Sequence, residues 1–199
     1  MIVRVLNAAR TLSPATTTLV VGHHGDVVRA RLREHEGLSF VVQEPQLGTA
    51  HALQQVEPAL EGRTGTLVLL SGDVPLLTSH TLARLIETHT RCGAVATVVT
   101  ALTERPYGYG RIVRTGGRIA RIVEERDASP AERLIKEINT GIYAFDLAPL
   151  WDALRGIAPQ NAQGEFYLTD LVAVYRRWKL AAETLCLDRK STRLNSSHV

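Results

Sequence analysis

The amino-acid sequence predicts one mixed α/β domain, in which helices cover both faces of a mostly parallel sheet. Short runs rich in Val, Leu and Ile alternate with amphipathic segments in the first half of the chain. Continuous apolar runs are typical of strands buried on both faces, and helices between them indicate right-handed βαβ units. A chain of 199 residues, 45% hydrophobic and 22% charged, suffices for one domain with a sizeable core.

Each element of the first half follows from its periodicity. Apolar β-branched runs predict buried strands at residues 17–22, 38–42 and 65–73. Apolar side chains at helical spacing predict helices at residues 2–11, 26–35, 49–60 and 78–90. Pro58 should end or bend the third of these helices, and Thr78 or Ser79 should cap the fourth.

The second half has more strands in sequence and is expected to extend the sheet of the first half. Strands are predicted at residues 93–102 and 137–146, and "YGRIVRTGGRIARIVEE" predicts a hairpin with its turn at "TGG". Helices are predicted at 147–157 and 167–178, the latter capped by Thr169.

Charge and composition exclude several classes of protein. The net charge of +3 depends on the last twelve residues, "DRKSTRLNSSHV"; without them the chain has 20 basic and 19 acidic residues. We expect residues 188–199 to be a non-native or disordered tail, and we find no indication of nucleic-acid binding. No apolar run of about 18 residues predicts a membrane span. Cys92 and Cys186 lie far apart, which favours reduced, structural thiols and a cytoplasmic location.

Two polar stretches follow strands of the first half, where open α/β sheets place their ligands. In "QEPQLGTAHA", the amide of Gln43 could pair with a pyrimidine, and Gly48 could let a flat base approach the backbone. Equally, Thr49 could be a helix cap among solvated glutamines. Asp73 in "SGDVP" stands where an oxygen ligand of Mg²⁺ is common, although a turn residue would also fit.

Two further stretches lie in the second half. The glycines of "YGYGR", at 107–111, could expose backbone N–H groups to a ligand or form a plain loop. Glu124 and Asn139 are expected at adjacent strand ends, where a carboxylate and an amide suit sugar hydroxyls. Singly, each fits a surface charge or a turn residue equally well.

In order, "QLGTAHA", "SGDVPLL", "YGYGRIV", "IVEERDAS", "EINTGIYAF" and "NAQGEFYLTD" closely resemble the uridylyltransferase domain of bacterial bifunctional N-acetylglucosamine-1-phosphate uridylyltransferase/glucosamine-1-phosphate acetyltransferases. The resemblance runs from residue 1 to about 187. It implies a Rossmann-like sugar nucleotidyltransferase fold that makes UDP-N-acetylglucosamine and pyrophosphate from UTP and N-acetylglucosamine 1-phosphate with Mg²⁺. For full-length relatives it implies a homotrimer.

The resemblance assigns roles by position. Gln43, Gly48 and Thr49 would hold the uridine; Ser71, Gly72 and Asp73 would line the nucleotide, with Asp73 on the metal and catalytic. Gly110, Glu124 and Asn139 would hold the N-acetylglucosamine moiety. Ser71 departs from the family pattern, in which tyrosine is frequent.

Larger departures lie at the ends of the chain. The family begins with a strand and a phosphate-gripping "LAAGxGTRM…PK" loop, which this sequence lacks. It also lacks the second Mg²⁺ ligand, a downstream asparagine, and the acetyltransferase domain. We therefore expect an N-terminally truncated domain at 1–187 whose sheet lacks a central strand, with poor solubility and no measurable activity by itself.

The substrates imply the mechanism. The attacking phosphate oxygen is already largely ionised at neutral pH, because the second pKa of a phosphomonoester is about 6, so no general base is required. His51 should accordingly be structural. Three alternatives stay open: a nucleotidyltransferase for another sugar 1-phosphate, a glycosyltransferase that releases UDP, and a non-catalytic nucleotide-sugar-binding fragment.

Overall fold

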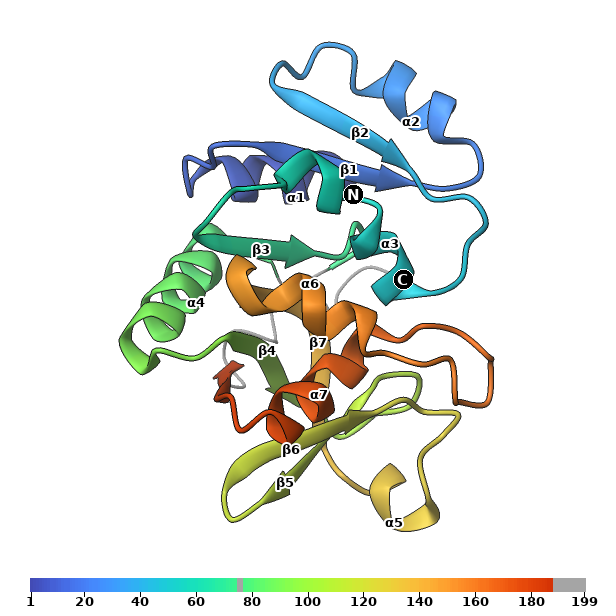
Figure 1. Cartoon of the computed structure of the whole chain (residues 1–199), viewed down its shortest axis with the longest axis vertical. Helices are drawn as coiled ribbons and strands as arrows, with labels where there is room; N and C mark the ends of the chain where they lie inside the picture. Colours follow the sequence, from blue (N-terminus) through green and yellow to red (C-terminus); the bar gives the residue numbers. More distant parts are fainter. Residues whose placement is uncertain (75–76, 188–199) are drawn as a thin grey trace.

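The computed structural model describes residues 1–74 and 77–187, which fold into a mixed α/β structure (Figure 1). The predicted tail at 188–199 lies outside the described residues. The strands are β1 (Thr17–Val21), β2 (Leu38–Val42), β3 (Thr66–Leu70), β4 (Ala96–Leu102), β5 (Arg111–Thr115), β6 (Arg118–Val123), β7 (Glu137–Asp146) and β8 (Ala182–Leu187). The α-helices are α1 (Ile2–Arg10), α2 (Gly25–Arg31), α3 (Thr49–Gln54), α4 (Ser79–Cys92), α5 (Pro130–Arg133), α6 (Leu147–Arg155) and α7 (Leu171–Arg177). Two short 3₁₀ helices are η1 (Glu57–Leu60) and η2 (Leu168–Asp170).

The sheet is mixed, and most of its strands run in one direction. Strands β3, β4 and β5 each pair antiparallel with β7, and β8 pairs parallel with β4, so these four strands share a direction. Strand β6 is antiparallel to β5 and runs with β7. Neighbouring strands of this six-stranded sheet are therefore mostly antiparallel pairs, because β7 lies between strands of the opposite direction.

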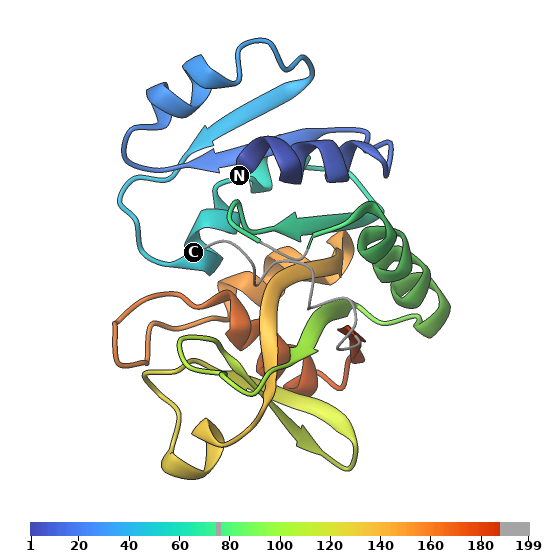
Figure 2. The same cartoon turned by 180° about the vertical axis from the view of Figure 1, so that it is seen from behind.

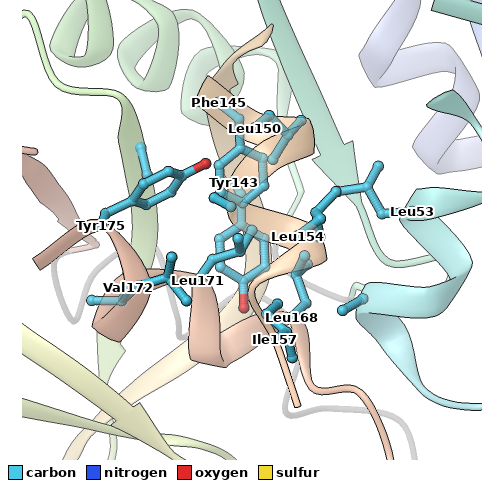
Figure 3. Close-up of a cluster of buried hydrophobic side chains, with 14 of the residues drawn as sticks. Leu53, Tyr143, Phe145, Leu150, Leu154, Ile157, Leu168, Leu171, Val172 and Tyr175 are labelled. Atoms are coloured by element: carbon cyan, nitrogen blue, oxygen red, sulfur yellow. The ribbon is translucent and has the colours of Figure 1, made fainter. Parts of the chain in front are cut away.

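Helices cover both faces of the sheet, as the alternation along β7 shows. Tyr143 and Phe145 belong to a core formed with α3, α6 and α7, which Figure 3 shows in close-up. Ile142 and Ala144 point to the other face and join a second core with α4. Figure 2 shows α1 and α4 together on that side of the molecule. A period of two along a strand between two buried layers gives this arrangement.

Strands β1 and β2 form a separate parallel pair rather than part of the larger sheet. Within the described residues, β1 pairs only with β2 and β3 only with β7, so one edge of each has no strand partner. A cavity of about 950 Å³ lies between them, lined by both strands, by α1 and by Leu53, Val56 and Leu60. The strands of the described residues thus lie in two separate sheets, on either side of a largely apolar cavity.

Most predicted elements are confirmed to within a few residues, but two predicted caps are wrong. Thr78 caps α4 by accepting a hydrogen bond from the Thr81 amide at 3.1 Å. Thr49, in contrast, is the first residue of α3, and Gly48 stands at the N-cap without a side-chain bond. Thr169 lies inside η2, where its hydroxyl bonds elsewhere.

Several features were missed or misjudged from the sequence. Helix α5 and strand β8 were not predicted; α5 begins with a capping box formed by Ser129 and Glu132. Cys92 and Cys186 are free, as expected, but both are exposed rather than part of the core. Among the described helices none is long and apolar enough to cross a membrane; α4, at 14 residues, is the longest.

Candidate active site

Five of the nine predicted site residues line one cavity. Its apolar part lies between β1 and β3, and polar groups line it where strands end: Thr49, Ser71, Gly72, Glu124 and Asn139. Ser71 and Gly72 are adjacent, so these residues come from four stretches far apart in the sequence, and the fold brings them together. The other four predicted residues, Gln43, Gly48, Asp73 and Gly110, are not among the lining residues but directly neighbour them in space or in sequence.

The turn from β2 into α3 is held by contacts within and beyond it. The Gln43 side chain donates to the carbonyl of Gly48 at 2.9 Å and contacts His51 Nδ1 at 3.0 Å. The Thr49 hydroxyl accepts from the backbone amide of Leu168 at 3.0 Å. The threonine therefore anchors this turn to a distant segment of the chain instead of capping its own helix.

Gly48 is required at its position by a close approach of backbone. Its φ of +109° is strained for any residue with a side chain, and an added Cβ would lie 2.6 Å from the carbonyl oxygen of Phe166. The backbone of residue 166 also bonds to Leu47 and Ala50, at 2.8 Å each. The packing of the backbone thus explains why residue 48 is a glycine without any ligand. The predicted contact of Gly48 with a base stays a prediction.

Ser71, which directly follows β3, is bonded to Gly141 in the middle of β7. The backbone amide and the hydroxyl of Ser71 both donate to the Gly141 carbonyl at 3.3 Å. Gly141 has a φ of +77°, and a Cβ there would lie 2.6 Å from the Ser71 hydroxyl oxygen. Gly72 follows and also lines the cavity, so this turn brings backbone without a side chain to the cavity wall.

Asp73 is an exposed carboxylate two residues beyond Ser71. No three His, Cys, Asp or Glu side chains gather into a metal site in the part of the chain that the structure describes. A site with one carboxylate nevertheless suits Mg²⁺, which commonly keeps several waters and completes its shell with substrate phosphates. The donor chemistry at Asp73 therefore fits this ion.

Gly110, Glu124 and Asn139 lie together at the ends of β5, β6 and β7. The backbone N–H of Asn139 donates to the Gly110 carbonyl at 2.9 Å, and a Cβ on Gly110 would lie 3.3 Å from Glu124 Oε1. Burial raises the pKa of Glu124, while the hydrogen bond donated by Thr169 at 3.0 Å opposes this shift. A carboxylate, an amide and a bare backbone therefore share one corner of the cavity.

The Asn139 side chain already has partners within the protein. Its Oδ1 accepts from the Gly141 amide at 3.1 Å, and its Nδ2 donates to the Tyr143 hydroxyl at 2.6 Å. One hydrogen of Nδ2 and one lone pair of Oδ1 remain for a ligand. The side chain is thus held in one orientation before any ligand arrives.

A buried ion pair supports this corner and was missed by the sequence reasoning. The Arg111 side chain is 1% exposed and pairs with Glu125 at 2.6 Å, and this hydrogen bond lowers the pKa of Glu125. Arg111 also donates to the Tyr109 carbonyl, and Glu125 accepts from the Gly108 amide at 3.1 Å. The pair fastens the 107–111 loop, which carries Gly110, to the end of β6.

Thr169 was also missed as a support of the site, and the partner of His51 was not predicted. Thr169 belongs to "NAQGEFYLTD", so the motif marked the segment but not the residue. His51 has the structural role that was predicted, and its partner is a predicted site residue, Gln43. The spacing of eight residues across a strand end and a helix gave no signal of that contact.

The comparisons agree with this architecture. A family model described as nucleotidyl transferase matches residues 3–186. A solved structure of UDP-glucose pyrophosphorylase complexed with UDP-glucose superimposes with a TM-score of 0.68, covering 90% of this chain and 76% of the other, at 16% sequence identity. The fold is thus that of a sugar nucleotidyltransferase, and the chain belongs to the nucleotidyl transferase family.

Sequence comparison shows which proteins of this family the chain resembles. The chain is 49% identical over 190 residues to the bifunctional protein GlmU of Pelotomaculum thermopropionicum, covering 94% of this chain and 41% of that protein. It is 48% identical over 177 residues to GlmU of Brevibacillus brevis, covering 88% and 38%. It is 44% identical over 199 residues to GlmU of Heliobacterium modesticaldum, covering 98% and 43%. The chain spans about two fifths of the length of these relatives.

Proposed function

We propose that this chain carries the uridine- and sugar-recognising part of an N-acetylglucosamine-1-phosphate uridylyltransferase. The complete protein would convert UTP and N-acetylglucosamine 1-phosphate into UDP-N-acetylglucosamine and pyrophosphate. The observation that carries the proposal is the convergence of Thr49, Ser71, Gly72, Glu124 and Asn139 on one cavity. These residues come from separate motifs that resemble one family.

The groups around the cavity suggest how the substrates would be divided. Gln43, Gly48 and Thr49 would hold the uridine, since an amide and exposed backbone groups suit a pyrimidine edge. The turn at 71–73 would line the phosphates. Gly110, Glu124 and Asn139 would hold the sugar, because a partly buried carboxylate and a fixed amide offer an acceptor and a donor to hydroxyl groups.

The reaction would proceed by positioning of two phosphate groups. An oxygen of the sugar phosphate attacks the α-phosphorus of UTP, the bond from that phosphorus to the β-phosphate oxygen breaks, and pyrophosphate leaves. No side chain has to remove a proton, because the attacking phosphate is largely ionised at neutral pH. Asp73 would hold Mg²⁺, which when bound neutralises charge on the transferring phosphates.

A chimera tests the proposal. In this chimera, called the graft below, the chain replaces the segment that it matches in the Pelotomaculum relative. We expect pyrophosphate release from UTP that is faster with N-acetylglucosamine 1-phosphate than with glucose 1-phosphate. A preference for glucose 1-phosphate would indicate a nucleotidyltransferase for another sugar 1-phosphate. Release of UDP from a nucleotide sugar would indicate a glycosyltransferase. Binding of UDP-N-acetylglucosamine without turnover would indicate a non-catalytic module.

The proposal extends to the cellular location and the oligomeric state of the complete protein. The complete protein would be cytoplasmic, as the unpaired cysteines favour, and homotrimeric, as the resemblance implies for full-length relatives. Size-exclusion chromatography with light scattering on the graft measures the assembly, and a monomer would overturn that part of the proposal.

A further inference from the structure

We propose that His51 determines which base the site accepts, by occupying the last free hydrogen of the Gln43 side-chain amide. The inference rests on the proposed function, in which Gln43 reads the base. His51 itself would touch no substrate, so it acts as a positioning residue. Three contacts around these two side chains carry the argument.

The first contact fixes the orientation of the Gln43 amide. The group that lies 2.9 Å from the backbone carbonyl of Gly48 must be the NH₂, since a carbonyl oxygen can only accept. The same NH₂ lies 3.0 Å from His51 Nδ1. One hydrogen therefore points to Gly48 and the second to the imidazole.

The second step fixes the tautomer of His51. Because Nδ1 accepts from Gln43, it carries no hydrogen, and in the neutral ring the hydrogen stands on Nε2. The same end of the Gln55 side-chain amide lies 3.1 Å from Nε2 and 3.3 Å from the His51 carbonyl. An Nε2–H needs an acceptor, so we assign the Gln55 oxygen to this position, an orientation that gives up the long bond from the Gln55 NH₂ to the His51 carbonyl.

The consequence is that Gln43 offers a ligand an acceptor and no donor. Both hydrogens of its NH₂ are in use, and no residue in the described ranges donates to its Oε1. In this arrangement Oε1 faces position 3 of the base, where uracil presents its N3–H donor and cytosine an unprotonated N3, while the amino group of cytosine lies at the neighbouring position 4. At position 3 an acceptor-only side chain favours uracil, and it faces the N3 lone pair of cytosine unfavourably.

Removing His51 would release the second hydrogen of the Gln43 amide. The side chain could then donate to cytosine N3 as well as accept from uracil, while its bond to Gly48 is kept. A change at His51 should therefore alter the choice between bases more than it alters turnover of UTP. A histidine that merely packs against α3 would instead affect both nucleotides equally.

The test compares UTP and CTP as substrates of the graft. For wild-type His51 we expect kcat/KM to favour UTP. In His51→Leu we expect this preference to fall about tenfold, equivalent to about 1.4 kcal/mol, mainly through a lower KM for CTP. In His51→Asn the side-chain oxygen can replace Nδ1 as acceptor, so the preference should be retained. An unchanged ratio in His51→Leu, or equal loss in both variants, overturns the inference.

A spectroscopic measurement covers the case in which His51→Leu does not fold. In ¹⁵N-histidine-labelled graft, the His51 ring, assigned through His51→Asn, should show a protonated Nε2 and an unprotonated Nδ1. A hydrogen on Nδ1 would overturn the inference. The proposed function is tested independently of His51 by the unsubstituted graft. It is contradicted if this graft uses CTP as well as it uses UTP, or if it uses neither nucleotide.

Discussion

Gly48→Ala is the substitution whose effect the structure determines most directly. The added Cβ would lie 2.6 Å from the carbonyl oxygen and 2.8 Å from the amide nitrogen of Phe166. Both of these are backbone atoms, so no side chain can rotate away to make room. Either the turn at Gly48 or the segment around Phe166 must move.

The magnitude follows from two contributions. A non-glycine residue at a φ of +109° and ψ of 177° is strained by roughly 1–3 kcal/mol. Movement of Phe166 also weakens its two backbone bonds, to Leu47 and Ala50, each worth about 1 kcal/mol. We therefore expect Gly48→Ala to lower the free energy of unfolding by about 3–5 kcal/mol.

Gly65→Ala is the matched control. Gly65 has nearly the same φ, +114°, but a Cβ there would meet no described atom within 4 Å. The difference between the variants, about 2 kcal/mol, thus isolates the close approach, and corresponds to about 1 M in urea midpoint for an m-value of about 2 kcal/mol per M. Pulse proteolysis of the graft in urea measures both midpoints, and equal midpoints would refute this account of Gly48.

Three further substitutions in the graft test the site. Asp73→Ala should lower kcat at least about 100-fold at ordinary Mg²⁺ without changing the urea midpoint, whereas Asp26→Ala, at another exposed aspartate, should leave kcat unchanged. Near-normal turnover in Asp73→Ala would contradict its role as a metal ligand. Asn139→Ala should raise the KM for the sugar phosphate roughly tenfold and that for UTP less; equal rises would indicate a structural role for Asn139. Tyr143→Phe removes only the hydrogen bond between Asn139 and the Tyr143 hydroxyl, and so measures the part of the KM effect that comes from loss of that bond. Because burial raises the pKa of Glu124, its ionised form destabilises the fold, and Glu124→Gln should increase stability above the ordinary carboxyl pKa of 4.5 but not below it. Urea midpoints at about pH 4 and about pH 7 check the sign, and a gain present only at the lower pH would contradict it.

Local patterns sufficed to predict most of the fold. Periodicity and apolar runs located α1, β2 and β7 closely: α1 buries Val5 and Leu6 on one face, and β2 and β7 are apolar, β-branched runs. The α-helix α3 ends at Gln54 and Pro58 lies in η1, consistent with a proline that has no amide hydrogen to continue an α-helix. Strand β8 was missed because "AETLCL" alternates weakly and contains exposed residues.

The candidate site was predictable only where a motif named its residues. Sequence reasoning found Glu124 but not Thr169, its hydrogen-bond donor 45 residues away. It offered a helix cap as one role for Thr49, because capping is a local rule, whereas the partner of this hydroxyl is the amide of Leu168. Contacts over such separations depend on how the elements pack, and a linear pattern does not encode them.

These long-range contacts give the segment 161–170 a particular place in the molecule. On one side, the backbone of Phe166 bonds to Leu47 and Ala50, and the Leu168 amide bonds to Thr49, so the segment holds the turn proposed for uridine. On the other side, Thr169 bonds to Glu124, and the Ala162 amide donates to Asp127 at 2.8 Å, so the same segment holds the corner proposed for the sugar. A change in its backbone should disturb both halves together, whereas a change at Asn139 should weaken binding of the sugar phosphate more than binding of UTP. The stretch "NAQGEFYLTD" would thus support both halves through its hydrogen bonds to other parts of the chain, without contacting a substrate itself.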